Sequence, residues 1–342
     1  MPVRVTTVER RDVPVALHAI GNVEAFQTVT LRSRVDGRLA DVRFKEGDEI
    51  RTGDLLFVID PGPFQAALDQ AKANLAKANA ESANAAVQER RMATLVESGI
   101  VSRDEWDRTR TASETAAASV DAAKAAVENA KLQLGFCHIT SPLDGRIGRL
   151  LVNQGNLVKT NDTELATINQ MKPIYVSFTV PEKELPAIRQ WNAAHPLATR
   201  VAFPGGAEPA AGELSFIDNR VDTTTGTVLL RAVFTNADEA LWPGQFVNVT
   251  LTLTTDRGAV VVPAPTVQAG QDGSYVFVVK PDATVDYRRV KIERTEGGDA
   301  VVASGVEPGE RIVTTGFVRL APGVKVTVED APPATERIGA AR

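Results

Sequence analysis

Apolar and small residues recur at alternating intervals of three and four along the stretch from Phe64 to Leu134. A sustained repeat of 3.5 residues is typical of helices that wind around each other. The stretch contains no proline and a single glycine, Gly99, and alanine and other strong helix formers dominate it. We therefore expect two helices that separate near Gly99 and form an antiparallel hairpin.

The recurring positions define one seam on each predicted helix. Small seam residues allow the two helix axes to approach closely. At 1.5 Å per residue, arms of roughly 33 to 36 residues give a hairpin about 50 Å long, which projects into solvent or into a partner. The first seam consists of Leu68, Ala71, Leu75, Ala78, Ser82, Ala85, Met92 and Val96, with Glu89 interrupting it. The second consists of Trp106, Thr109, Ser113, Ala116, Val120, Ala123, Val127, Ala130 and Leu134.

The tip of the predicted hairpin contains signals that end one helix and start the next. Gly99 suits the left-handed conformation that ends a helix, and Ser102 followed by Glu105 indicates a capping box. These signals are fully accounted for by a simple turn between two helices with no further role. Ile100 and Val101, however, are apolar residues in a turn that faces water, and such residues beside charges are typical of docking surfaces. From these residues alone, a docking surface and a plain turn are equally compatible with the sequence.

The two segments that flank the hairpin repeat one another with one constant offset, the one that separates Asp36 from Asp144. Each contains short alternating strands separated by glycine-containing turns. Two such half-motifs resemble the biotinyl/lipoyl carrier fold, so we expect residues 32–61 and 136–169 to form one split lipoyl-like domain around a hairpin of residues 62–135. The matches are Asp36-Gly37-Arg38 with Asp144-Gly145-Arg146, Gly47 with Gly155, Ile50 with Val158, and Asp54 with Asp162.

A carrier function is one alternative that this resemblance raises. In carrier domains the two halves join through a tight turn that bears the modified lysine. Here the hairpin occupies that turn, and neither Asp60-Pro61-Gly62 nor Gly135-Phe136-Cys137 contains a lysine. The half-motifs are therefore expected to hold the root of the hairpin, and an intact mass without a modified lysine would remove the carrier alternative.

The remainder of the chain reads mainly as β-strands. Residues 172–254 alternate in the strand manner, with one short helix expected over 181–194, and predict a small β-barrel. Turns are expected at Pro204-Gly205-Gly206 and Pro243-Gly244. Residues 255–330 contain further short strands, and the strands of residues 1–31, with a turn at Gly21-Asn22, are expected to pair with them. Residues 331–342 read as a disordered tail.

Composition and charge exclude several classes of function. The 342 residues carry a net charge of −5 without a basic patch, so nucleic acid is not an expected partner. No apolar run is long enough to span a membrane. Cys137 beside His138 makes a poor metal site, and the three histidines fall in three predicted domains, so we expect no metal, no cofactor and no enzyme activity.

A split lipoyl-like domain that carries a helical hairpin resembles the periplasmic adaptor, or membrane fusion protein, family of tripartite efflux pumps. Adaptors that serve resistance-nodulation-division (RND) pumps share an Arg-x3-Leu-x6-Ser pattern at the hairpin tip, and Arg91, Leu95 and Ser102 stand at these spacings. The runs Asp222–Asn236 and Leu241–Val249 resemble the barrel signature of the family. The resemblance implies a membrane-proximal β domain of residues 1–31 and 255–330.

The resemblance also implies partners and a location. An adaptor of this family would form a ring of six subunits and contact a proton-driven RND transporter of the inner membrane. Its hairpin tip would dock on a TolC-like outer-membrane channel through Arg91, Leu95 and Ser102, with Gly99, Ile100 and Val101 in the turn. We expect a periplasmic protein attached to the inner membrane through an anchor or signal that this chain does not contain. An adaptor of an ATP-driven exporter or type I secretion system is the second alternative.

Overall fold

The computed structural model describes residues 2–202, 209–270, 273–317 and 320–330, and the fold is mainly β with three α-helices. The chain forms two compact units. One consists of Met1–Asn22, Val176–Val233 and Phe246–Arg342, and the other of Val23–Tyr175 and Phe234–Gln245. We describe each unit separately, beginning with the one that contains the two long helices.

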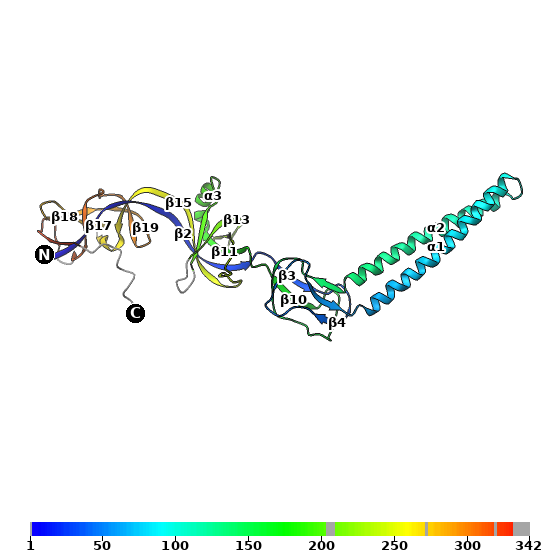
Figure 1. The fold of residues 1–342 in the computed structure, drawn as a ribbon. Helices are drawn as coiled ribbons and strands as arrows, with labels where there is room; N and C mark the ends of the chain where they lie inside the picture. The colour runs from blue at the N-terminus through cyan, green and yellow to red at the C-terminus, as the bar shows by residue number, and fades with distance from the viewer. Residues whose placement is uncertain (1, 203–208, 271–272, 318–319, 331–342) are drawn as a thin grey trace. The chain divides into compact units, whose positions relative to one another are not determined.

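The two long helices are α1, Gly62–Glu97, and α2, Arg103–Gly135, and they run side by side (Figure 1). Every predicted seam position is buried or partly buried, and Leu68, Ala78, Ser113 and Val120 are the most deeply covered. Glu89 is also partly buried, so the contact continues past it. Ion pairs spaced three or four residues apart lie on the outer faces and support the helices by a few tenths of a kcal/mol each, as such pairs do at exposed sites.

The internal repeat is visible in the strand topology of the same unit. Two four-stranded sheets have the orders β3-β10-β8-β5 and β7-β6-β4-β9, and the offset that relates Asp36 to Asp144 maps each strand of one order onto the matching strand of the other. We call these two sheets the lipoyl-like domain. The strands are β3 Thr28–Arg32, β4 Gly37–Val42, β5 Glu49–Ile50, β6 Leu55–Ile59, β7 His138–Thr140, β8 Gly145–Ile147, β9 Leu157–Val158 and β10 Glu164–Asn169.

Reciprocal hydrogen bonds join the two halves of the lipoyl-like domain. Asp36 Oδ1 accepts from the backbone N and the Oγ1 of Thr160, at 2.6 and 2.8 Å. Asp144 Oδ1 accepts from the same two atoms of Thr52, at 2.7 and 2.9 Å. Thr52 and Thr160 are themselves equivalent positions of the repeat. These hydrogen bonds lower the pKa of both carboxyl groups, because they favour the charged form.

The other unit contains a closed barrel in the strand order β12-β13-β14-β11-β2-β15, with β15 pairing back to β12. The short helix α3, Leu185–Asn192, follows one 3-10 turn and is shorter than the expected 181–194. Ile188 of α3 is fully buried. The barrel strands are β2 Glu9–Ala25, β11 Ile174–Pro181, β12 Ala198–Ala202, β13 Ala210–Asp222, β14 Thr227–Phe234 and β15 Phe246–Pro263.

The strands of residues 1–31 differ from the expectation that they all complete the membrane-proximal domain. They are shared among three sheets: β1, Pro2–Thr7, joins that domain, β2 joins the barrel through β11 and β15, and β3 joins the lipoyl-like domain through β10. The expected turn at Gly21-Asn22 is absent from β2, which continues through both residues. Gly21 serves close packing instead, because a Cβ there would lie 2.6 Å from Val249 Cγ2.

A single strand, β15, also crosses the expected boundary between residues 254 and 255. Its pairing with β2 shifts register between Thr252 and Thr254 and again between Asp256 and Ala259. Gly258 takes the left-handed φ of +65° at the second shift, and its N–H donates to Asp12 Oδ1 at 2.9 Å. Bulges of this kind bend a strand pair without ending it, which explains why one ladder runs on past the expected boundary.

The strands of residues 255–330 and β1 form a sheet in the order β16-β17-β21-β1-β22, with β18 paired to β17, while the hairpin of β19 and β20 extends the barrel sheet. Two of these strands, β18 and β19, are separated by Val290 alone. The expected turn at 204–206 and the expected tail at 331–342 lie outside the described residues. The bounds are β16 Gln268–Gly270, β17 Gly273–Val279, β18 Val285–Arg289, β19 Lys291–Glu296, β20 Asp299–Ser304, β21 Arg311–Thr315 and β22 Thr327–Asp330.

In the part of the chain that the structure describes, none of the helices combines the length and the apolar character needed to cross a bilayer.

Acid is expected to loosen the lipoyl-like domain through Asp36 and Asp144. Their lowered pKa values mean that both carboxylates stabilise the folded state above the ordinary aspartate pKa of about 3.9. That contribution disappears as the pH falls through the lower, folded-state values. Asp36→Asn and Asp144→Asn should each lower the calorimetric unfolding temperature at pH 7. In each variant the unfolding temperature should also fall less steeply than in the wild type as the pH is lowered to 3. Glu97→Gln, at an exposed site, is the control, and a variant that retains the wild-type pH profile would contradict the assignment.

Candidate docking site at the turn between the helices

The turn that joins the helices begins with a complete C-terminal cap on α1. Gly99 has a φ of +71°. Its N–H donates to the carbonyl of Val96 at 3.1 Å, and the N–H of Ile100 donates to the carbonyl of Leu95 at 3.0 Å. This pair of hydrogen bonds is the Schellman motif, in which an apolar residue after the glycine accompanies one in the last helical turn. Leu95 and Ile100 occupy those two positions.

The second half of the turn starts α2. Ser102 has an extended conformation, with φ −78° and ψ 155°, and its Oγ accepts from the N–H of Glu105 at 3.3 Å. Asp104 and Glu105 lie in the first turn of α2, where negative charge interacts favourably with the helix dipole. Ser102 is thus the N-cap residue that the sequence predicts, and the turn between the helices is tightly defined.

The residues of the predicted docking pattern are partly brought together by this geometry. Arg91 and Leu95 lie four residues apart on α1 and therefore share one helical face. The backbone hydrogen bond from Ile100 to Leu95 ties the turn to that face. Arg91 is exposed, and among the described residues no carboxylate lies within ion-pair distance of it. Its guanidinium is free to meet a partner.

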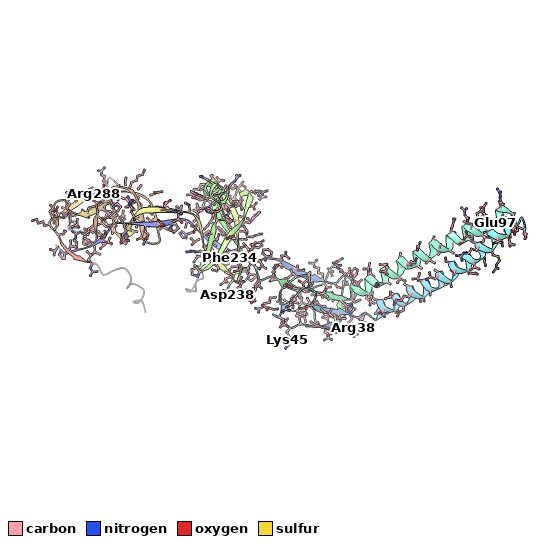
Figure 2. All side chains as sticks on the ribbon, turned by 45° about the horizontal axis from the view of Figure 1, so that its top comes forward. Arg38, Lys45, Glu97, Phe234, Asp238 and Arg288 are labelled. Atoms are coloured by element: carbon pink, nitrogen blue, oxygen red, sulfur yellow. The ribbon has the colours of Figure 1, made fainter. Side chains whose placement is uncertain are left out.

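Ile100 is the most prominent apolar group of the turn. Its side chain is 69% exposed, although Schellman geometry places it next to Leu95, which is partly buried. Val101 is partly buried. Glu97, labelled in Figure 2, lies at the same end of the helical pair. The turn therefore presents one exposed isoleucine among charged side chains, a composition that suits contact with another protein surface.

A groove beside the turn was not predicted from the sequence. It has a volume of about 450 Å³ and is lined by Ala93, Val96 and Glu97 of α1 and Arg103, Trp106 and Asp107 of α2. Trp106 belongs to the predicted seam, and the guanidinium of Arg110 lies 5.4 Å from its ring centre. The signal that could have found the groove is Trp106, the largest side chain in either seam, at a position close to the turn.

Family models match three consecutive parts of this chain. Residues 27–170 match the barrel-sandwich hybrid domain of RND membrane fusion proteins, residues 173–255 match their β-barrel domain, and residues 258–319 match their C-terminal permuted SH3 domain. The chain therefore belongs to the RND membrane fusion proteins. Members of this family are structural adaptors and not enzymes.

Individual relatives agree with this membership. The multidrug resistance protein MdtA of Klebsiella pneumoniae is 39% identical over 99% of this chain and 84% of its own length. MdtA of Proteus mirabilis is also 39% identical, over 96% of this chain and 80% of its own. The solved MacA-MexA chimera, which contains the Pseudomonas aeruginosa MexA α-hairpin domain, shares the fold with a TM-score of 0.61 at 22% identity, covering 91% of this chain and 100% of its own.

Removal of the Ser102 hydroxyl should loosen the start of α2. Ser102→Ala deletes the side-chain acceptor of the Glu105 N–H, and loss of such a cap costs about 1 kcal/mol. We expect faster amide hydrogen exchange at Glu105 and its neighbours. Ser102→Asp keeps an oxygen acceptor at the N-cap and should retain the slow exchange. Equal exchange in Ser102→Ala and the wild type would show that the hydroxyl does not cap the helix.

Proposed function

We propose that this chain is the periplasmic adaptor of an RND tripartite efflux pump that exports several unrelated compounds. In this role it links a proton-driven transporter of the inner membrane to a TolC-like channel of the outer membrane. Its relatives are named multidrug resistance protein MdtA, and resistance through export is the activity that we carry over to this chain.

One observation carries the proposal more than any other. The three matched domains follow one another across residues 27–319 in the order of the family, and the helices α1 and α2 are inserted between the two half-motifs of the first of them. A carrier domain needs neither the barrel nor the inserted helices. The domain division expected from the sequence carries over into the proposal, with β2 reassigned to the barrel and β3 to the lipoyl-like domain.

The helical pair acts as an antiparallel coiled-coil hairpin in this proposal. Its length of about 50 Å, at 1.5 Å per residue, suits a rod that spans part of the periplasm. The many alanine, serine and threonine residues of the seams support a close helix–helix contact, and the outer faces remain charged and exposed. Stiffness follows from the continuous seam, and a stiff rod can transmit a displacement from one end to the other.

The tip docks on the channel through Arg91, Leu95 and Ser102, with Gly99, Ile100 and Val101 forming the turn. Arg91 supplies a charge-assisted hydrogen bond to a carbonyl or carboxylate of the channel. Ile100 supplies apolar contact area. The carbonyl of Leu95 and the hydroxyl of Ser102 already accept the capping hydrogen bonds of the two helices, so the contribution of these residues to docking includes holding the turn in shape.

The remaining parts of the proposal concern assembly. Six copies form a ring, and the barrel and membrane-proximal domains contact the transporter. The ring lies in the periplasm at the inner membrane. The extended ladder of β2 and β15, with its two register shifts, supports a mechanism in which the ladder bends as the transporter cycles.

Reversal of charge at the tip should abolish drug resistance without unfolding the protein. We expect a strain that lacks this protein to regain resistance to several unrelated compounds when it produces the wild type, and to remain susceptible with Arg91→Asp. Arg91 is exposed and unpaired among the described residues, so the substitution should leave the helical circular dichroism unchanged.

The control is Lys77→Asp, a charge reversal on the same helix but remote from the turn, which also removes the weak, exposed ion pair with Glu81. It should restore resistance like the wild type. Normal resistance with Arg91→Asp would rule out the tip assignment. A wild type that restores no resistance would instead count against drug export, and the search would turn to another substrate.

A further inference from the structure

The loop between β14 and β15 packs with the lipoyl-like domain as part of one compact unit, Val23–Tyr175 with Phe234–Gln245. Its inner anchor is Asn236, whose side chain is 6% exposed. The Asn236 amide donates to the carbonyls of Met171 and Leu241, at 2.9 and 3.0 Å, and accepts from the N–H of Leu241 at 2.9 Å. Asn236 and Glu239 both have a left-handed φ, +51° and +54°, which residues other than glycine adopt at a cost. Surrounding contacts must therefore hold this loop in place.

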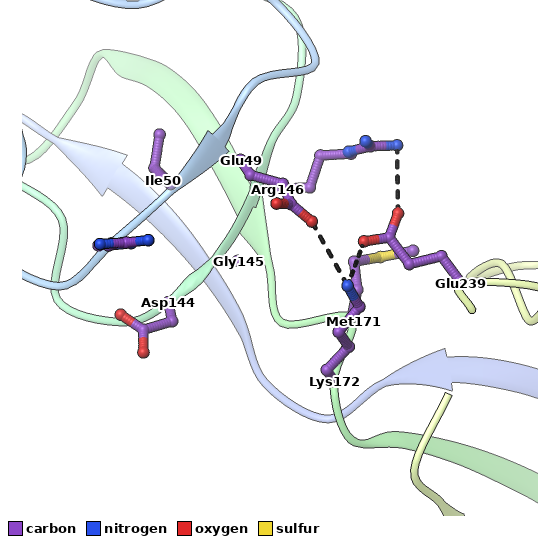
Figure 3. Close-up of a pocket in the computed structure, with 9 residues that line it drawn as sticks. Glu49, Ile50, Asp144, Gly145, Arg146, Met171, Lys172 and Glu239 are labelled. Carbon is purple, nitrogen blue, oxygen red and sulfur yellow. Dashed lines mark ion pairs between the residues drawn. The ribbon is translucent and has the colours of Figure 1, made fainter. Parts of the chain in front are cut away.

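Glu239 of the loop and three charged side chains outside the loop form a chain of ion pairs that alternates in sign (Figure 3). Lys172 Nζ lies 2.8 Å from Glu239 Oε1 and 3.5 Å from Glu49 Oε1. Arg146 Nη1 lies 3.6 Å from Glu239 Oε2, and the Arg146 guanidinium stands 5.3 Å from the ring centre of Trp242. They border a cavity of about 360 Å³. We name Glu49, Arg146, Lys172 and Glu239 the ionic clamp.

The repeat within the lipoyl-like domain provides an internal comparison for the ionic clamp. The pairing of Glu49 with Arg146 in β5 and β8 has its counterpart, at the equivalent place in the other half, in the pairing of Leu157 with Arg38 in β9 and β4. At the counterpart positions Leu157 is 80% exposed, and Arg38 lies 3.6 Å from Asp60 instead. The counterpart half forms its sheet with a leucine at this place. An acid at position 49 is therefore not a requirement of the half-motif itself.

The charges of the ionic clamp favour attachment of the loop to the lipoyl-like domain. The hydrogen bond between Lys172 and Glu239 raises the pKa of the Lys172 ammonium and lowers the pKa of the Glu239 carboxyl, so both groups keep their charge. The side chains of Glu49 and Lys172 are 65% and 45% exposed. Interactions between such groups are weak and sensitive to salt. The free energy needed to separate the clamp residues is therefore much smaller than the free energy of unfolding of either sheet.

We propose that Lys172 and Glu239 are positioning residues that hold the loop of residues 235–245 on the lipoyl-like domain, through an ionic clamp that opens without unfolding the sheets. Asn236 stays as the neutral anchor when the charges separate. Because this loop is the connection between barrel strands β14 and β15, its attachment sets how firmly that connection is held during the pump cycle. All of these contacts lie within one unit, and the clamp does not depend on the docking of the tip.

Amide hydrogen exchange of the purified full chain tests the proposal directly. Lys172→Met and Glu239→Gln should each accelerate exchange over residues 236–245 by roughly threefold to tenfold in low salt. Peptides from β6 and β10 should be unchanged. The double variant should be no faster than the faster single variant, because the two side chains act through one contact. Lys172→Arg should retain slow exchange, and high salt should bring the wild type toward the variants.

The matched control is Arg38→Met, which removes the counterpart ion pair with Asp60. It should leave the exchange of residues 236–245 at the wild-type rate. Additive effects of the two single variants, or no acceleration in either, would overturn the clamp. Equal acceleration of exchange in β6 and β10 would also overturn the clamp, because it would show that these charged residues stabilise the whole domain and not the loop in particular. None of these results bears on the Arg91→Asp assay, so failure of the adaptor proposal can be told apart from failure of the clamp.

Discussion

The strand pair formed by β6 and β7 is the contact on which the insertion of the long helices depends. The chain leaves β6 at Ile59, passes through both helices, and returns into β7 directly beside β6, where Phe57 pairs with Ile139 and Val58 with His138. The N–H of Ile59 donates to the carbonyl of Cys137 at 2.8 Å. A chain segment of this length carries an entropic cost of closure, and the antiparallel contact between the helices offsets it. The fold of the two sheets can therefore carry the helices without disturbing either half-motif.

The two ends of the helical pair have different chemistry. The root adjoins the deepest core of the unit, in which Phe57, Ile59 and Cys137 are fully buried. Burial, followed by the charge of Asp60, raises the pKa of the Cys137 thiol, which keeps it neutral. The turn, in contrast, is held by the capping hydrogen bonds at both helix ends and presents Ile100 to solvent. The helical pair is thus anchored in a buried core at its root and ends in a capped, exposed turn.

The two half-motifs share the same strand arrangement but carry different side chains at exposed positions. Asp36 and Asp144 serve one shared structural purpose, since each binds the threonine of the opposite half. Glu49 and Leu157 occupy equivalent places and have different surroundings. Repetition of the buried and turn residues maintains the sheets, while the exposed positions are free to diverge. An ionic clamp in one half and an exposed leucine in the other illustrate this separation.

Local chemistry explains most of what could be read from the sequence. Periodicity located both seams, since burial of a helix stripe needs small or apolar residues every three to four positions, and the glycine and serine of the turn were identified because caps are local.

What the sequence could not decide was long-range pairing. Gly21 reads as a turn by composition, and only the packing of Val249 against it reveals a continuous strand. Likewise, the ion pair between Lys172 and Glu239 joins two segments that are distant in the sequence. The groove beside the turn is lined by residues of both long helices, so it also forms only in the tertiary structure. The sequence by itself determined the two long helices, the repeat and the family. Only the tertiary structure decided which sheet received each N-terminal strand, because strand partners are chosen by contacts across the whole chain.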